Sequence, residues 1–265
     1  MNLDGYFRRI GHTGAARADL HTLRAVHRAH ALNIPYENLD VILKRPVSMA
    51  APDIYDKIVN GGRGGWCYEM NGLLEWALRE IGFRVTRMTG GVMREHFGDE
   101  AFGNHLVLRV DLDQPWIADT GIGDCFIEPL PMTEGEHRQD HRHFRLERLT
   151  DDQWRLHNRA GARPPSFDFI DAPADEALLS ATCHKLQNDP ESMFRRYLVV
   201  QQMSERGGSA LLNQTLTDLS DGAAHELTST ETFTATLTGM IGSLPAGAEG
   251  LWGNIPALQE IEETS

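Results

Sequence analysis

The stretch from Gly61 to Asn71 reads GGRGGWCYEMN, and it leads from a glycine-rich loop into a helix. Its glycine pairs end the preceding helix and permit the tight backbone turns of a loop. The run that follows has apolar side chains every three or four residues, which is typical of a helix with one buried face: Met70, Leu74, Leu78 and Ile81. Because Gly82 favours a helix end, we expect a helix that begins near Cys67 and ends at Gly82.

Cys67 therefore lies where a helix favours an anion. The free N–H groups and the positive end of the helix dipole stabilise negative charge at this point. For a cysteine this lowers the thiol pKa and increases the fraction of thiolate, which is the reactive form. A cysteine in such a pattern is nevertheless more often an unreactive residue of the core. A phosphate-binding loop is disfavoured, because the stretch lacks a Gly-Lys-Ser/Thr ending.

Composition restricts the class of protein. The chain has 265 residues, of which 41% are hydrophobic and 24% charged, an ordinary globular composition. Its formal net charge of -13 disfavours binding to nucleic acid or to anionic membranes. The three cysteines follow no metal or disulfide spacing, and neither a signal sequence nor a membrane-spanning run is recognisable. We therefore expect a cytoplasmic protein without nucleic-acid or membrane partners.

The hydrophobic period changes twice along the chain. Residues 1–82 have mainly helical spacing, including a short helix that Pro52 opens and a loop-like segment over 36–50. From Phe83 the pattern alternates, with five strand-like runs that imply a small sandwich or barrel. The last third is mixed: a helix over 174–186, a strand in MFRRYLVVQQM (193–203), and a final helix that a Thr228–Glu231 capping box would open. The fold class is α+β.

A nucleophilic cysteine needs a base, and the base needs a third group to orient it. His105 begins an apolar strand directly after a turn, and Asp119 ends another strand before a glycine turn. A carboxylate buried there without a partner would be costly, and a histidine would remove that cost. Taken singly, a hydrogen-bonded strand-end histidine and a turn aspartate explain these residues as well. The ordered set of Cys67, His105 and Asp119 is more informative than any member.

Five ordered segments resemble the arylamine N-acetyltransferase family: YFRRIG (6–11), IPYENLDV (34–41), RGGWCYEMN (63–71), GNHLVLRV (103–110) and ADTGIGD (118–124). This resemblance implies three parts. They are a helical bundle over 1–82 that carries the cysteine, a β-barrel over 83–187 that carries the histidine and the aspartate, and an α/β lid over 188–265. The core would be of the cysteine-protease-like Cys-His-Asp type.

The resemblance also implies a function. Cys67, His105 and Asp119 match the family's catalytic triad, with acetyl-coenzyme A as donor and ping-pong transfer to arylamine or hydrazine acceptors. Tyr36 and Ile122 match positions of the acceptor pocket, where the family more often has phenylalanine. Gly123 matches a position close to coenzyme A, and Phe194 is a second cofactor-side candidate. Because this chain has Ile122 where the family more often has an aromatic residue, it lacks a ring at that position on which an aryl group could stack.

Other functions remain open at this point. The same triad suits a papain-like or transglutaminase-like hydrolase, and an amide synthase of the same fold is a related alternative. A binding protein that keeps the pocket but has lost the chemistry is disfavoured, because all three triad residues are retained. A metal site built from His137, His141 and His143 competes with a solvated polar loop, and we expect no metal. A homodimer is compatible with the sequence.

Overall fold

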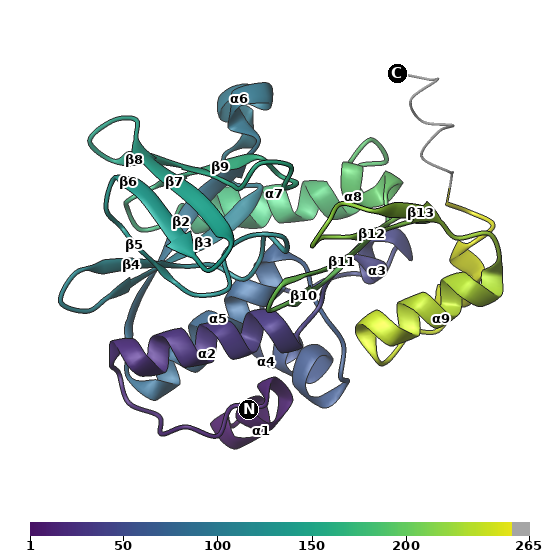
Figure 1. Cartoon of the computed structure of the whole chain (residues 1–265), viewed down its shortest axis with the longest axis horizontal. Helices are drawn as coiled ribbons and strands as arrows, with labels where there is room; N and C mark the ends of the chain where they lie inside the picture. The colour runs from purple at the N-terminus through teal and green to yellow at the C-terminus, as the bar shows by residue number, and fades with distance from the viewer. Residues whose placement is uncertain (256–265) are drawn as a thin grey trace.

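The computed structural model describes residues 1–255 of the 265-residue chain. Its first part is helical and lies beneath the two sheets in Figure 1. The helices of this part are α1 (Leu3–Ile10), α2 (Leu20–Asn33), α3 (Leu39–Ile42), α4 (Ala51–Tyr55), the π-helical turn η1 (Asp56–Asn60) and α5 (Cys67–Ile81). One apolar core joins α1, α2 and α5 to the first barrel strands, so these helices form a platform for the sheet.

Helix α5 has the bounds that its sequence pattern predicts. At its N-terminus, a carboxylate oxygen of Glu69 accepts a hydrogen bond from the Trp66 backbone N–H at 3.3 Å, which satisfies a donor that precedes the helix. At its C-terminus, Gly82 adopts a left-handed conformation with φ of 108°. Its N–H bonds the carbonyls of Leu78 and Arg79, and a side chain there would be strained.

The larger sheet has eight antiparallel strands in the order β5-β4-β3-β2-β9-β8-β7-β6. Their bounds are β2 (Arg84–Val92), β3 (His105–Asp111), β4 (Pro115–Ala118), β5 (Leu130–Pro131), β6 (Gly135–Gln139), β7 (Arg142–Arg148), β8 (Gln153–His157) and β9 (Ser166–Ile170). The sheet curls into a barrel-like form around its own apolar core (Figure 1). Between β2 and β3 lie α6 (Arg94–Phe97) and the 3-10 turn η2 (Gly98–Ala101).

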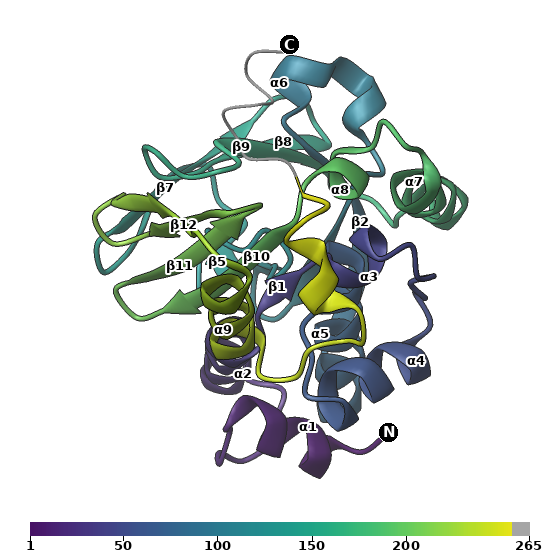
Figure 2. The same cartoon turned by 90° about the vertical axis from the view of Figure 1, so that its right-hand side faces the viewer.

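The smaller sheet has the order β1-β10-β11-β12-β13. It contains β1 (Tyr36–Glu37), β10 (Val199–Ser204), β11 (Gly207–Leu212), β12 (Thr215–Asp218) and β13 (Ala224–Glu226), and α9 (Thr230–Ile241) packs beside it (Figure 2). The remaining elements are α7 (Glu176–Asn188), α8 (Met193–Arg196) and the 3-10 turn η3 (Ala248–Leu251). Because β1 comes from the helical part and pairs with β10, the first and last thirds of the chain share one sheet.

The α+β fold class and the barrel-like middle part are confirmed. Three local predictions are wrong. The segment after Tyr36 forms β1 and α3 rather than a loop, residues 193–196 form α8 ahead of β10, and α9 is capped by Ser229 rather than Thr228. The part boundaries at 82 and 187 stay a prediction, and residues 256–265 of the third part lie outside the described residues.

Candidate active site

The structure brings His105 and Asp119 together at one end of the barrel-like sheet. His105 is the first residue of β3, and Asp119 directly follows β4, its antiparallel neighbour. His105 Nε2 lies 2.6 Å from Asp119 Oδ2, and both side chains are buried. A carboxylate can only accept, so Nε2 carries the proton and Nδ1 is the nitrogen left for a second partner. Asp119 thereby fixes both the orientation and the tautomer of His105.

Asn71 of α5 connects Asp119 to the cysteine helix. Its Nδ2 donates to Asp119 Oδ1 at 2.8 Å and to the Leu106 carbonyl at 2.6 Å. Its Oδ1 accepts the Thr120 backbone N–H at 2.8 Å. Asn71 is fully buried, so each of these bonds replaces one that water would otherwise supply. The sequence analysis missed this residue. Its signal was a polar side chain one helical turn after Cys67.

Cys67 lies against both neighbouring segments. Its Sγ is 3.7 Å from the carbonyl oxygen of Asn104, the residue before His105. On the other side, a Cβ added to Gly121 would lie 2.8 Å from the Cys67 Cα. The three predicted segments therefore meet at the start of α5.

The pKa of Cys67 differs in direction from the sequence-based expectation. Burial removes the thiolate from water and raises the pKa of the Cys67 thiol well above its usual value, and the nearby Cys183 and Asp119 add to the effect. The contact with the Asn104 carbonyl fits a protonated sulfur that donates. The expected lowering at a helix start is wrong because desolvation outweighs it. A thiolate at this position needs a base close by.

Buried ion pairs hold the loop that precedes Cys67. Both Arg63 Nε and Nη2 donate to Glu37 Oε1, at 3.0 and 2.6 Å. The Lys57 ammonium bridges Asp40 and Glu69 at 2.9 and 2.8 Å. Desolvation raises the pKa of the Glu69 carboxyl to about 7, even though Lys57 opposes that shift. This network joins β1, η1 and the first turn of α5, which fixes where the helix begins.

Tyr36 and Ile122, the predicted acceptor residues, lie in different surroundings. Tyr36 lines a small cavity of about 10 Å³ together with Met70, Gly123 and Gln201, which is room for about one water molecule. Ile122 packs in the apolar core of the barrel. An aryl ring is larger than this cavity, so an acceptor that entered here would displace lining side chains.

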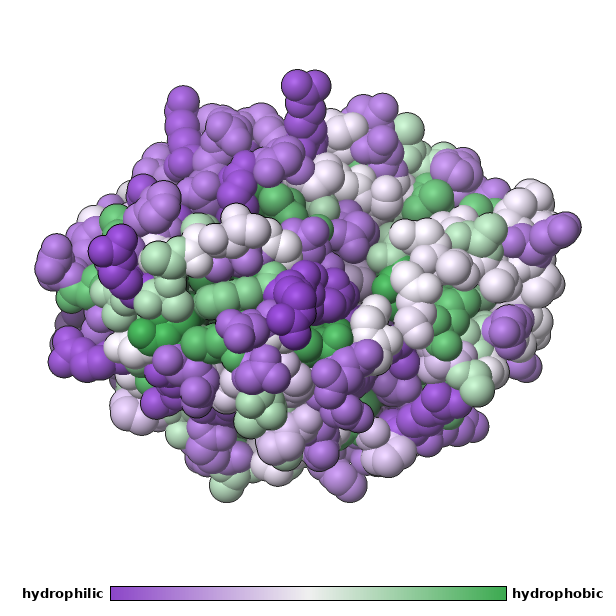
Figure 3. Space-filling view, turned by 90° about the horizontal axis from the view of Figure 1, so that it is seen from below, coloured by the Kyte–Doolittle hydropathy of each residue, from purple (hydrophilic) through white to green (hydrophobic). Residues whose placement is uncertain are grey.

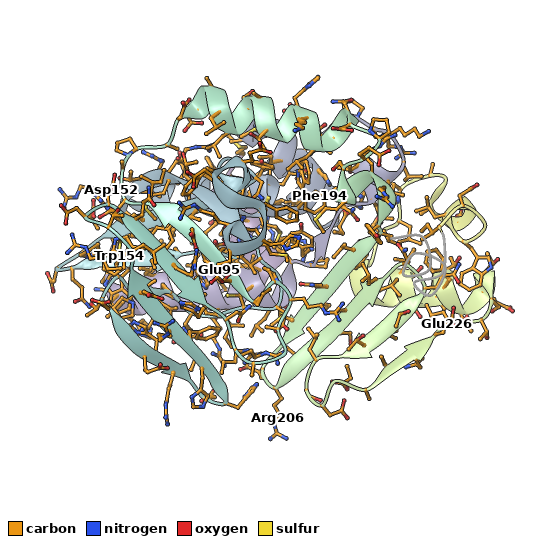
Figure 4. The ribbon with its side chains drawn as sticks, turned by 90° about the horizontal axis from the view of Figure 1, so that it is seen from above. Glu95, Asp152, Trp154, Phe194, Arg206 and Glu226 are labelled. Atoms are coloured by element: carbon orange, nitrogen blue, oxygen red, sulfur yellow. The ribbon has the colours of Figure 1, made fainter. Side chains whose placement is uncertain are left out.

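Gly123 and Phe194, the predicted cofactor-side residues, have different neighbours as well. Gly123 has a φ of 78° and is covered by the side chain of Gln201. Gln201 Oε1 accepts the Asp124 N–H at 2.8 Å, and the same atom would overlap a side chain at Gly123. Phe194 of α8 packs edge-on against Trp66, with ring centroids 5.3 Å apart. Figure 4 shows Phe194 near the middle of the molecule, between α7 and the strands, whereas Arg206 and Glu226 lie at the edge.

Neither a metal cluster nor a membrane span is found in the part of the chain that the structure describes. Over residues 1–255 no three His, Cys, Asp or Glu side chains are grouped to hold an ion. The segment with His137, His141 and His143 forms the β6–β7 hairpin instead of the expected loop. Within the same residues, every helix is too short or too polar to cross a bilayer.

Comparison with known proteins gives the family. Residues 19–242 match a family described as N-acetyltransferase. The arylamine N-acetyltransferase of Mycolicibacterium smegmatis is 34% identical over 235 residues, which cover 86% of each chain. That of Escherichia coli K12 is 32% identical over 233 residues, covering 84% of this chain and 81% of the relative. The solved M. smegmatis enzyme has a TM-score of 0.85 at 30% identity, covering 96% of this chain and 98% of that one.

These matches, together with the fold, define an acyltransferase. The chain belongs to the arylamine N-acetyltransferase family. A further similar structure, of Mycobacterium marinum arylamine N-acetyltransferase, was solved in complex with CoA; its TM-score is 0.85 at 26% identity, covering 94% of this chain and 97% of that one.

Proposed function

We propose that this protein transfers an acetyl group from acetyl-coenzyme A to arylamines or hydrazines through a thioester on Cys67. The observation that carries the proposal is the buried His105–Asp119 pair, 2.6 Å apart, beside the N-terminus of the helix that begins at Cys67. Family membership supports the reaction class, and the CoA complex of the M. marinum relative supports the donor.

In the first half-reaction, His105 Nδ1 takes the proton of Cys67, and Asp119 stabilises the resulting imidazolium. Burial raises the pKa of the Cys67 thiol, so removal of its proton needs His105 as the base. The thiolate attacks the acetyl carbonyl, the sulfur–carbon bond of the donor breaks, and coenzyme A leaves with a proton from His105. One thioester replaces another, so this step is close to isoenergetic. Backbone N–H groups at the start of α5 would stabilise the oxyanion.

In the second half-reaction, an amine attacks the acetyl-cysteine. His105 removes the amine proton, the carbon–sulfur bond breaks, and Cys67 recovers its proton. Amide formation makes this half favourable. Burial of the triad supports transfer over hydrolysis, because water that reached the acetyl-enzyme would hydrolyse it.

The surroundings of Phe194 fit a coenzyme that is both apolar and anionic. The indole Nε1 of Trp66 is buried, and no residue that the structure describes accepts its hydrogen bond. Arg195 and Arg196 follow Phe194 in α8 and add local positive charge to an acidic chain. Phe194 and Gly123 would contact the coenzyme, Trp66 would donate to one of its carbonyls, and Tyr36 and Ile122 would contact the acceptor.

The test is release of coenzyme A in the presence of acetyl-coenzyme A and an arylamine such as 4-anisidine. We expect release that depends on the amine, abolished in Cys67→Ala and preserved in Cys125→Ala. Cys125 is a matched control, because it is a second buried cysteine, packed in the barrel core. Amine-dependent release by Cys67→Ala would contradict the proposal, as would hydrolysis of a peptide amide without any acetyl transfer.

A further inference from the structure

His27 of α2 is a fully buried histidine with a partner at each ring nitrogen. Its Nε2 lies 3.0 Å from the backbone nitrogen of Asp119, and its Nδ1 lies 2.9 Å from the carbonyl oxygen of Ile127. In the sequence it is one member of an apolar stripe, with no sign of a role. The two contacts span the loop that leaves β4 with Asp119 and returns before β5.

The partners of His27 determine its protonation state. A backbone N–H can only donate, so Nε2 has to be an unprotonated acceptor toward Asp119. A carbonyl oxygen can only accept, so Nδ1 has to carry the proton toward Ile127. The ring is therefore a neutral imidazole with its hydrogen on Nδ1. Burial favours the same state, because it lowers the pKa of His27 to about 4.

Helix α2 holds the far end of this loop through other contacts as well. The Phe126 ring stacks on His27, with centroids 5.6 Å apart and planes 19° apart. The guanidinium of Arg28 donates to Glu128 Oε1 at 3.0 Å. The face of the molecule that is seen from below in Figure 3 mixes hydrophilic and apolar side chains. Helix α2 thus holds both ends of one loop, and His27 is the residue through which it hydrogen-bonds Asp119.

We propose that His27 is a positioning residue for Asp119. By accepting the hydrogen bond of the Asp119 backbone N–H, His27 keeps the Asp119 carboxylate aligned with His105. The inference rests on the proposed function, because it assigns His27 to the same triad. Asp119 takes part in four hydrogen bonds: its N–H donates to His27, its Oδ1 accepts from Asn71 and from the Gly121 N–H, and its Oδ2 accepts from His105. Because the ring stays neutral, no second cation competes with His105 for that carboxylate. A displacement of about 1 Å among reacting groups can cost about 100-fold in rate.

The matched test compares His27→Leu with His30→Leu. His30 is equally buried on the same helix, but its Nδ1 bonds the Tyr6 hydroxyl and its Nε2 has no hydrogen-bond partner among the described residues, so neither ring nitrogen bonds the loop. For His27→Leu we expect acetylation of Cys67 and its alkylation by iodoacetamide to slow at least about tenfold. His30→Leu should lose a similar amount of stability and keep both rates within about twofold. His27→Gln, which retains an acceptor, should recover most of the rate. Equal rates for His27→Leu and His30→Leu would overturn the proposal.

A second measurement uses the wild-type protein, so it does not depend on a variant that folds. With ¹⁵N-labelled histidine, we expect the His27 signals of a neutral ring with Nδ1 protonated and Nε2 bare at pH 7. A proton on Nε2 would overturn the proposal, because it would face the Asp119 N–H. If the ring has the expected tautomer but wild-type Cys67 is not acetylated, the proposed function fails while the structural role of His27 stands.

Discussion

A Cβ atom on Gly121 would lie 2.8 Å from the Cα of Cys67, so the loop after Asp119 touches the backbone of the cysteine directly. The same atom would lie 2.9 Å from Asn71 Nδ2, which holds Asp119. Such contacts are closer than a side chain tolerates. The absence of a side chain at Gly121 is thus what allows the helix start and the carboxylate loop to share one site.

Gly121→Ala should therefore separate the two segments. We expect acetyl-enzyme formation to slow by about 10- to 100-fold, since it depends on positioning at the scale of 1 Å. Gly239→Ala is the control: Gly239 lies in α9 with nothing near its added Cβ, and the substitution should stabilise the fold by about 0.5 kcal/mol. Single-turnover acetylation and urea unfolding measure the two effects. Wild-type acetylation by Gly121→Ala would contradict the importance of this contact.

Asp119→Asn tests the orientation of His105. The amide cannot stabilise an imidazolium by charge, and we expect acetyl transfer to fall by about 100- to 10,000-fold. Asp168→Asn is a suitable control, because Asp168 is also a buried carboxylate but pairs with Arg94 and Arg155 instead of His105. Steady-state kinetics of both variants at matched folded fraction provide the measurement. A larger loss in Asp168→Asn would refute the assignment.

Asn71→Ala should damage both stability and activity. It leaves the Leu106 carbonyl and the Thr120 N–H, both buried, without their partner. We expect a loss of about 2–4 kcal/mol in the free energy of unfolding, measured in urea. The rate of acetylation, corrected for the unfolded fraction, should also fall, since Asp119 Oδ1 loses one of its two donors and keeps only the Gly121 N–H. An unchanged rate would show that His105 and the Gly121 N–H, with His27 on the backbone, suffice to hold Asp119.

The titration of His27 should contribute to the pH dependence of the free energy of unfolding. Its pKa is lowered from 6.5 to about 4 by burial, so between those values the unfolded chain binds more protons. Stability then falls as the pH falls. We expect His27 to account for about 2 kcal/mol of the loss from pH 7.5 to pH 5.

The measurement is the difference in unfolding free energy between wild type and His27→Leu at those two pH values. Glu69, whose raised pKa of about 7 acts in the opposite direction, cancels in this difference, and so does His30 to first order. The difference should shrink toward pH 5. A constant difference would mean that His27 titrates like a histidine in water.

Gly123→Ala should be destabilising for two reasons that can be separated. The residue has a φ of 78°, and an added methyl group would overlap the Gln201 amide. We expect a cost of about 1–3 kcal/mol in the free energy of unfolding. In the double variant with Gln201→Ala the overlap is removed. The losses in unfolding free energy of the two single variants should therefore add up to more than the loss of the double variant, by more than about 0.5 kcal/mol. Strict additivity would show that only the backbone conformation matters.

The sequence predicts the elements that carry the candidate triad better than it predicts their surroundings. The bounds of α5 follow from its apolar spacing and Gly82, and alternation marks β3 and β4. His27 and Asn71 could not be assigned, because their partners are 92 and 48 residues away along the chain. Local patterns carry no information about such pairs.

Two errors have a physical cause in tertiary structure. The run MFRRYLVV has strand-like residues, yet Ser192 caps a helical turn over Met193–Arg196 before β10 begins. The expected low pKa of Cys67 followed from its place at a helix start, whereas its burial depends on α7 and the barrel, which the local sequence does not reveal.

The most direct test is intact-protein mass spectrometry after brief incubation with acetyl-coenzyme A and no acceptor. We expect wild type to gain one acetyl group, Cys67→Ala to gain none, and Cys125→Ala to behave as wild type. Addition of an arylamine should then remove the acetyl group and yield the acetylated amine. An acetyl group on Cys67→Ala, or wild type that stays unmodified while it still acetylates the amine, would contradict a thioester on Cys67.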